Sequence, residues 1–409
     1  MNLVFGRTTH CRKHETTVNA FFVRHRTGTL CGMSPSGDLF ADITTDLLFD
    51  MFDVPEEEGL GSLLHAARQA HYTLPYLALS VLDRDGHTIG PAAAEVLARA
   101  RRRARHYERV LERVSAQTSV TAMKGPSLSH YYPAGVLRPQ GDLDLVVPDE
   151  AELWRAARIL CEKEPHGAWV TLFGAPERHL AFTLTWDAEE PLLDPQLKVE
   201  LLTAALLGDF DAVPVRVRPP RDRLLSNLVC LAEERLQRDF HPRDALDLYA
   251  MSRHPLPTAA ELVETADRYR LAPEIIELVR YAEDLLPIGR FAHVAPVLAE
   301  AAEEERQRRG ERTPAPTVSG TRYRLRQGMP VHGMLLGRTS DSPDRTSAEF
   351  HWYGEEALLL TPLGDYLLVG DPLVSPDRHA AAVEERNRLA SAAGTADPKQ
   401  AVDDLLDSR

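Results

Sequence analysis

The sequence predicts an α+β fold, in which a mixed sheet with helices forms a core and a helical lobe follows it. Three observations support this prediction. Short runs in which apolar and polar residues alternate, as in strands, lie among helical runs over about residues 115–220. From Asp222 to about Arg309, apolar residues recur every three or four positions, as in helices. Beyond residue 320, short apolar runs separated by Gly and Pro turns predict further strands.

These patterns divide the 409 residues into five predicted segments, which suits a chain long enough for two or three hydrophobic cores. They are a small β-containing N-terminal unit over 1–54, the core over 60–220, the helical lobe over 221–309, a small β-rich appendage over 320–376 and a polar tail over 379–409.

Several elements can be assigned to these segments from periodicity and from the residues at their ends. Predicted helices cover Thr44–Phe52, Leu60–Leu82, Pro91–Val114 and Glu150–Cys161. Predicted strands cover His179–Trp186 and Pro195–Leu202 in the core and, in the appendage, Tyr323–Arg326 and the short apolar runs that follow it.

Composition excludes several classes of protein. The net charge of −14 argues against a general nucleic-acid coat protein, because such proteins bind phosphates through excess Lys and Arg. No apolar run approaches the length that spans a membrane, and no secretory signal segment is present at the N-terminus. Four scattered cysteines do not form a disulfide pattern. We therefore expect a cytoplasmic protein without a membrane partner.

Asp142 and Asp144 are the main candidates for chemistry. They alternate with Leu143, Leu145 and Val147, which predicts a strand with both carboxylates on one face and the apolar side chains on the other. Two neighbouring carboxylates repel each other, and a bound cation removes that cost. Oxygen ligands beside a substrate phosphate suit Mg²⁺.

Two more features belong to this pattern. Lys124-Gly125-Pro126-Ser127 is a glycine turn that opens a predicted helix, and such turns present backbone N–H groups to phosphate. Glu200 lies on a separate predicted strand, between apolar neighbours. The order is thus a glycine turn, two acids on one strand and a third acid on another.

This order resembles the polymerase-β-like nucleotidyltransferase superfamily. The stretch MKGPSLSHYYPAGVLRPQGDLDLVV over 123–147 is similar to an uncharacterised nucleotidyltransferase family of that superfamily, whose hallmark is a Lys-Gly turn followed by Arg-Pro-x-x-Asp-x-Asp with an apolar residue between the acids. The resemblance covers roughly residues 60–290 and is specific over 123–147. It implies the superfamily's mixed-sheet catalytic core.

The resemblance also implies a reaction, transfer of a nucleoside monophosphate from an NTP, with ATP the expected nucleotide, to an acceptor. Asp142 and Asp144 would hold two Mg²⁺ ions, and Glu200 would complete the second site and help to activate the acceptor. A hydroxyl or similar group on a peptide, protein or small molecule is the implied acceptor. Natural-product biosynthesis is the implied setting.

The resemblance assigns nucleotide contacts as well. Gly125 and Ser127 would approach the triphosphate, and Lys124 and Arg138 would pair with its oxygens. A helical segment similar to that of related enzymes would face the nucleotide. The implied nucleotide-binding residues are Lys124, Gly125, Ser127, Arg138, Arg235 and Asp247.

Two alternatives stay open at the level of sequence. Pro126 removes one N–H from the turn, and Lys198 can pair with Glu200, so the chain can also be a catalytically inactive adaptor that recruits a pathway partner. The arginines between Arg99 and Arg113 form a basic helix face that could hold RNA, although a solvated face is the favoured interpretation. RNA is therefore the less favoured acceptor, and the oligomeric state stays open.

Overall fold

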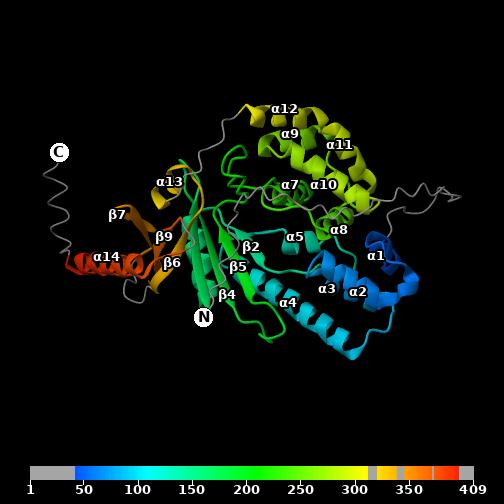
Figure 1. Ribbon diagram of the computed structural model, residues 1–409, viewed down its shortest axis with the longest axis horizontal. Coiled ribbons are helices and arrows are strands. Elements are labelled where there is room, and N and C mark those ends of the chain that lie inside the picture. The colour runs from blue at the N-terminus through cyan, green and yellow to red at the C-terminus, as the bar shows by residue number, and fades with distance from the viewer. Residues whose placement is uncertain (1–41, 312–319, 339–344, 371–372, 396–409) are drawn as a thin grey trace.

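The computed structural model describes residues 42–311, 320–338, 345–370 and 373–395 (Figure 1). The predicted N-terminal unit therefore lies mostly outside the described residues. Its last element is helix α1 (Thr45–Met51), where a helix was predicted. Thr44 caps this helix, because its side-chain oxygen accepts a hydrogen bond from the backbone N–H of Leu47 at 3.2 Å.

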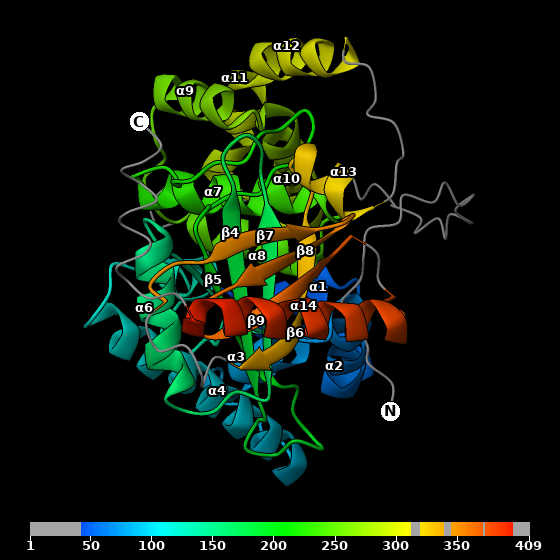
Figure 2. The ribbon, with the colours of Figure 1, turned by 90° about the vertical axis from the view of Figure 1, so that its left-hand side faces the viewer.

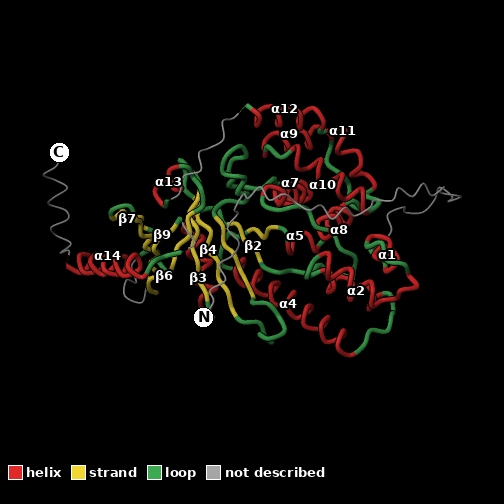
Figure 3. The backbone as a smooth tube through the Cα atoms, viewed as in Figure 1, coloured by secondary structure: helices red, strands yellow, loops and turns green. Residues whose placement is uncertain are grey.

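A nine-stranded mixed sheet runs through the centre of the molecule (Figure 3). Its strands lie in the order β1-β2-β5-β4-β3-β6-β9-β8-β7, and among these described strands only β2 and β5 pair in parallel. The predicted α+β fold is thus confirmed. The strands are β1 (Thr121–Met123), β2 (Leu143–Val146), β3 (Gly167–Phe173), β4 (His179–Trp186), β5 (Leu197–Leu202), β6 (Val331–Arg338), β7 (Glu349–Tyr353), β8 (Glu356–Leu360) and β9 (Gly364–Val369).

Helices cover both faces of the sheet. On one face lie α4 (Pro91–Ser115) and α6 (Glu150–Cys161), whose Tyr107 and Trp154 are buried against strand residues such as Phe182. On the other face lies α5 (Gly125–Ser129) together with the helical lobe. The helices of the lobe are α7 (Arg223–Glu233), α8 (Pro242–Met251), α9 (Ala259–Tyr269), α10 (Ala272–Leu285), α11 (Val294–Val297) and α12 (Ala299–Gly310).

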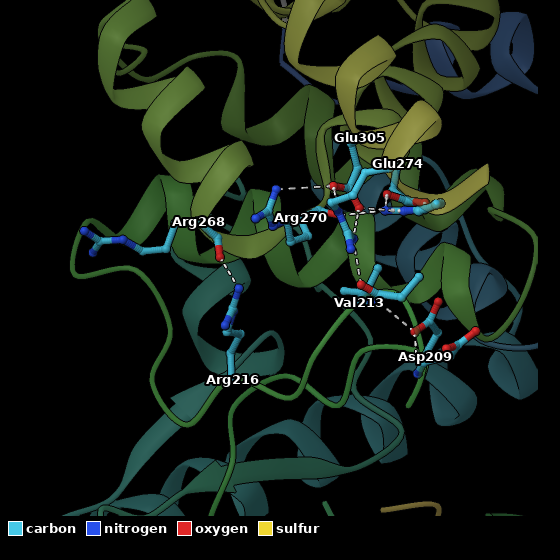
Figure 4. A network of polar contacts seen from close by, with 11 residues as sticks. Asp209, Val213, Arg216, Arg268, Arg270, Glu274 and Glu305 are labelled. Carbon is cyan, nitrogen blue, oxygen red and sulfur yellow. Dashed lines mark hydrogen bonds and ion pairs between the residues drawn. The ribbon is translucent and has the colours of Figure 1, made fainter. Parts of the chain in front are cut away.

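Ion pairs within the lobe lie beside the loop that follows β5, and hydrogen bonds connect the two (Figure 4). Glu305 of α12 is 4% exposed and accepts hydrogen bonds from Arg308 and Arg309. Arg309 also pairs with Glu274 of α10 at 2.6 Å. Arg308 donates to the carbonyl of Ala212 in the loop at 2.7 Å. Glu305 thus positions Arg308, and Arg308 attaches the lobe to the loop.

Two of the predicted elements are wrong. The single helix predicted over Leu60–Leu82 is two helices, α2 (Gly59–Ala70) and α3 (Leu74–Arg84), because His71 has an extended backbone and Pro75 starts a new helix. The predicted strand Tyr323–Arg326 belongs to helix α13 (Thr321–Arg326). In α13 the two buried residues are four positions apart, which is the spacing of a helix face.

The four C-terminal strands continue the sheet of the core. β6 pairs with β3 in antiparallel orientation, with Val170 opposite Gly333 and Leu172 opposite Val331. Tyr366 of β9 lies in the same buried cluster as these residues. Helix α14 (Pro376–Thr395) packs against β6 and β9, as Figure 2 shows. The division into five segments stays a prediction, but β6 is hydrogen-bonded to the core and β9, β8 and β7 follow it in the same sheet.

Gly333→Ala is expected to destabilise the protein by about 1–3 kcal/mol, because it overpacks the junction of β3 with β6. A methyl group at Gly333 would lie 2.3 Å from Cγ1 of Val170 and 2.9 Å from Cβ of Tyr366. Chemical denaturation measures the effect. Gly61→Ala is the matched control, since its methyl group meets no atom within 4 Å and alanine favours a helix. Equal stability of the two variants would contradict the prediction.

No helix among the described residues has both the length and the hydropathy needed to cross a membrane.

Candidate functional site

Two of the three predicted acids, Asp144 and Glu200, lie on the neighbouring strands β2 and β5. Because these strands are parallel and Asp144 is in register with Glu200, the two side chains lie next to each other on one face. Leu143 and Leu145 point to the opposite face, into the core under α4 and α6. Asp142 precedes β2 by one residue. The sheet thus brings the acids together on the face that carries α5 and the lobe.

Asp144 is a partly buried acid whose pKa is raised. Burial raises its pKa, and the charges of Asp142 and Glu200 raise it further, to about 8, against the opposing effect of Lys124 and Lys198. Its Oδ1 atom is buried without a hydrogen-bond partner. A buried carboxylate oxygen among like charges is a position that a cation would stabilise.

Two polar neighbours hold the other acids. Lys198 Nζ lies 3.2 Å from Oδ2 of Asp142. Burial lowers the pKa of Lys198, but the surrounding carboxylates raise it more. Thr183 Oγ1 donates a hydrogen bond to Oε1 of Glu200 at 2.7 Å. Within the described residues, no three acids, histidines or cysteines converge as a ready-made metal site. The ammonium of Lys198 would therefore compete with a metal ion for Asp142.

The Lys124-Gly125 turn lies beside the acids, because β1 pairs with β2 and Met123 is opposite Asp144. Lys124 has a backbone φ of 49°, in the left-handed region, and precedes the first residue of α5. Burial lowers the pKa of Lys124, but the charges of Glu234 and Asp144 raise it more, so the ammonium stays charged. Its Nζ forms an ion pair with Glu234 of the lobe.

Ser127 of the same turn is engaged as an acceptor. Asn227 Nδ2 of α7 donates a hydrogen bond to its Oγ at 3.0 Å. Gly125 is surrounded by the side chain of Gln140 and the carbonyl of Asp142, at 3.6 and 3.9 Å from where a Cβ would lie. The predicted phosphate turn is therefore attached both to the acidic strand and to the lobe.

Arg138 and Asp247 lie together in a buried ion pair. Arg138 Nε and Nη2 donate to the two carboxylate oxygens of Asp247 at 2.7 and 2.8 Å. Tyr132 donates a third hydrogen bond to Asp247 at 2.7 Å. Burial lowers the pKa of Arg138, but the charge and hydrogen bonds of Asp247 raise it more. The pair connects the segment before β2 to α8.

Comparison with known proteins gives one match. A family model described as an uncharacterised nucleotidyltransferase matches residues 59–287 of the chain. The chain belongs to this family. The match spans more than half of the sequence and contains the glycine turn, all three acids and most of the helical lobe. No curated protein matches the chain, and no solved structure matches it either.

Arg235, another predicted nucleotide-binding residue of this nucleotidyltransferase, has its carboxylate partners within the lobe. Arg235 forms an ion pair with Glu277 of α10 and a second with Asp239 at 3.2 Å. The structure therefore groups Lys124, Gly125 and Ser127 with the acids, whereas Arg235 is engaged within the lobe.

The nucleotidyltransferase also contains polar residues near the site that the sequence prediction missed. Glu234 pairs with Lys124 and also with Arg238 at 3.1 Å. Glu233 accepts a hydrogen bond from the N–H of Gly208 at 2.8 Å, and burial raises the pKa of its carboxyl to about 7. Thr183 lies on β4, where its neighbours in the sequence are uncharged, so no local pattern marks it as a site residue. Only the pairing of β4 with β5 reveals its contact with Glu200.

Proposed function

We propose that the protein is a Mg²⁺-dependent nucleotidyltransferase that transfers NMP from an NTP, ATP in the first instance, to a hydroxyl or similar group. The acceptor is a peptide, a protein or a small molecule, in the setting of natural-product biosynthesis in the cytoplasm. The observation that carries the proposal is the register of Asp144 with Glu200, which puts two acids beside Asp142 on one face. The family match supports the general reaction.

The residues present fit a divalent cation. The orphaned Oδ1 of Asp144 and the mutual repulsion of the three carboxylates are both relieved by a bound cation. Asp142, Asp144 and Glu200 would hold the ions. Bound Mg²⁺ would neutralise charge on the reacting phosphate and on the leaving pyrophosphate.

The chain's own groups would orient the reactants. Lys124 and the N–H groups of the turn that begins α5 would contact the triphosphate, once Lys124 exchanges Glu234 for phosphate oxygens. The acceptor oxygen would form a bond to the α-phosphorus, and the bond from that phosphorus to the bridging oxygen would break. Pyrophosphate leaves with the bonding electrons, and Glu200 takes the hydroxyl proton.

The test is binding and transfer with the purified chain. Calorimetry with each of the four NTPs and Mg²⁺ is expected to detect binding, and α-³²P-labelled NTP is expected to label an acceptor in an extract of the producing cells. Asp142→Asn should eliminate the transfer of label. Transfer that is unaffected by this substitution, or that continues in EDTA, would refute the proposed mechanism.

A catalytically inactive adaptor is the second candidate. The bond between Lys198 and Asp142 favours it, because an ammonium group already neutralises part of the acidic cluster. The absence of any Mg²⁺·NTP binding, together with a tight complex with another protein of the same pathway, would decide for the adaptor.

A further inference from the structure

A cavity of about 320 Å³ lies beside the acidic strands, between α4 and the loops that lead into β2 and β5. Its volume is in the range of small-molecule sites. Gln140 and Gly141, the two residues directly before Asp142, form part of its wall. Arginines of α4 supply much of the remaining lining: Arg99, Arg102, Arg103, Arg105 and Arg109.

Three of these arginines build the cavity. Arg103 donates to the carbonyl of Gly141 at 2.8 Å and to that of Gln196 at 2.6 Å, so one guanidinium holds both loops. Arg99 and Arg102 each form an ion pair with a carboxylate of the second loop, at 3.1 and 3.0 Å. Their charges are therefore partly compensated, and their role is to fix the shape of the wall.

The remaining two arginines carry the uncompensated charge. In the part of the chain that the structure describes, no ion pair or hydrogen bond engages the guanidinium of Arg105 or Arg109. Burial lowers the pKa of the neighbouring His106, and the charges of Lys163 and Arg109 lower it further, as expected where positive potential accumulates. A negatively charged ligand would meet a favourable potential at this wall.

The cavity also has an aromatic side. Tyr72 and Tyr76 line it, and Tyr72 is 60% exposed, which is high for so large a ring. Its hydroxyl lies close to Gly141, so the ring is next to the acidic strand. Arginines opposite tyrosine rings suit a ligand that combines an anionic group with an apolar or planar part.

The cavity is separate from the predicted phosphate turn. In the sheet order β1-β2-β5, the Lys124 turn follows β1, whereas the loop 188–197 of the cavity leads into β5. The structure thus has two separate cationic places near Asp142, one at the turn after β1 and the other at the loops that lead into β2 and β5. If the turn receives the triphosphate, the arginine wall is left for the second substrate.

We propose that this cavity binds the acceptor, and that the acceptor carries an oxyanion, phosphate or carboxylate, which Arg105 and Arg109 hold. This inference rests on the proposed function. A small molecule or the end of a chain fits better than a stretch of RNA. The enclosed volume is small, the cavity wall also contains Glu189 and Asp194, and the whole chain carries a net charge of −14, all of which disfavour an extended polyanion.

The test is calorimetry on the full chain with Mg²⁺ and an ATP analogue in which a methylene group replaces the α,β-bridging oxygen. Glycerol 3-phosphate is the phosphate probe, and succinate is the carboxylate probe. At least one probe is expected to bind, and Arg105→Gln/Arg109→Gln should weaken it about tenfold or more. The affinity for the analogue should stay within about twofold. Arg101→Gln/Arg113→Gln removes the same charge from the same helix outside the cavity, and should change neither affinity.

Several results would overturn the inference. An equal loss of analogue binding in the Arg105/Arg109 variant would mean that the cavity holds the triphosphate. Equal weakening by the control variant would indicate a diffuse charge effect. Binding of a short oligoribonucleotide without binding of either probe would assign the wall to RNA. If the unmodified chain binds a probe through Arg105 and Arg109 but never binds the analogue, the oxyanion site stands and the proposed function fails.

Discussion

Asp144→Asn is expected to abolish nucleotidyl transfer, with a loss of about 10³-fold or more. The substitution keeps the size of the side chain but removes the charge that would hold a divalent ion against Glu200. Transfer of label from α-³²P-labelled NTP measures the loss. Thr185→Val is the matched control, because Thr185 is a buried polar residue of the same sheet that pairs with Lys198 and not with an acid. A variant that retains more than about a tenth of the activity would contradict a metal role for Asp144.

The same substitution is expected to stabilise the metal-free protein at alkaline pH. The pKa of Asp144 is raised from 3.8 to about 8, so the carboxyl keeps a proton in the folded state that it has lost in the unfolded state. Stability in EDTA should therefore fall as the pH rises through that range. The asparagine side chain has no such proton to lose, and a gain on the order of 1–3 kcal/mol is expected at pH 8. Thermal unfolding at pH 5 and pH 8 compares the two chains, and a variant less stable at pH 8 would contradict the prediction.

Asp247→Ala is expected to lower the free energy of unfolding by about 3–5 kcal/mol. Asp247 is completely buried and is the partner of Arg138 and of Tyr132. Without it, the guanidinium of Arg138 stays charged in an apolar environment with no counterion. Urea denaturation followed by circular dichroism measures the loss.

An exposed ion pair provides the comparison for Asp247. Glu277→Ala breaks the pair with Arg235 at the surface of the lobe, and the expected loss is at most about 1 kcal/mol. Arg138→Met combined with Asp247→Leu removes both buried charges and should recover much of the stability. If Asp247→Ala costs no more than Glu277→Ala, the buried pair is not what connects the β2 segment to α8.

The elements that carry the acids could be predicted from the sequence because their signals are local. Alternation of Asp142 and Asp144 with leucines requires a strand, and the structure has β2 there. His179–Trp186 is a strand with the predicted bounds, and Glu150–Cys161 is a helix with the predicted bounds. The prediction that Asp144 and Glu200 lie close together came from the family resemblance and not from periodicity.

The contacts that decide how each charge is used could not be predicted in this way. Arg138 and Asp247 are 109 residues apart in the sequence. No local pattern distinguishes an arginine in a buried ion pair from an arginine that is free to bind phosphate. The pairing of β6 with β3 joins segments 161 residues apart. Lys198 could pair with Glu200 on the same predicted strand, and the structure bonds it to Asp142 instead, a contact between two strands that periodicity does not reveal.

The position of β3 between β4 and β6 has a practical consequence for work with fragments. The family match ends at residue 287, before β6 begins. A protein cut at that boundary would leave the outer backbone N–H and C=O groups of β3 unpaired and would uncover the apolar residues that β6 and β9 now bury. Such an exposed strand is a template for pairing with another chain. Fragments that stop before Val369 are therefore expected to self-associate. The smallest fragment that stays monomeric is expected to extend beyond the segment that the family model matches.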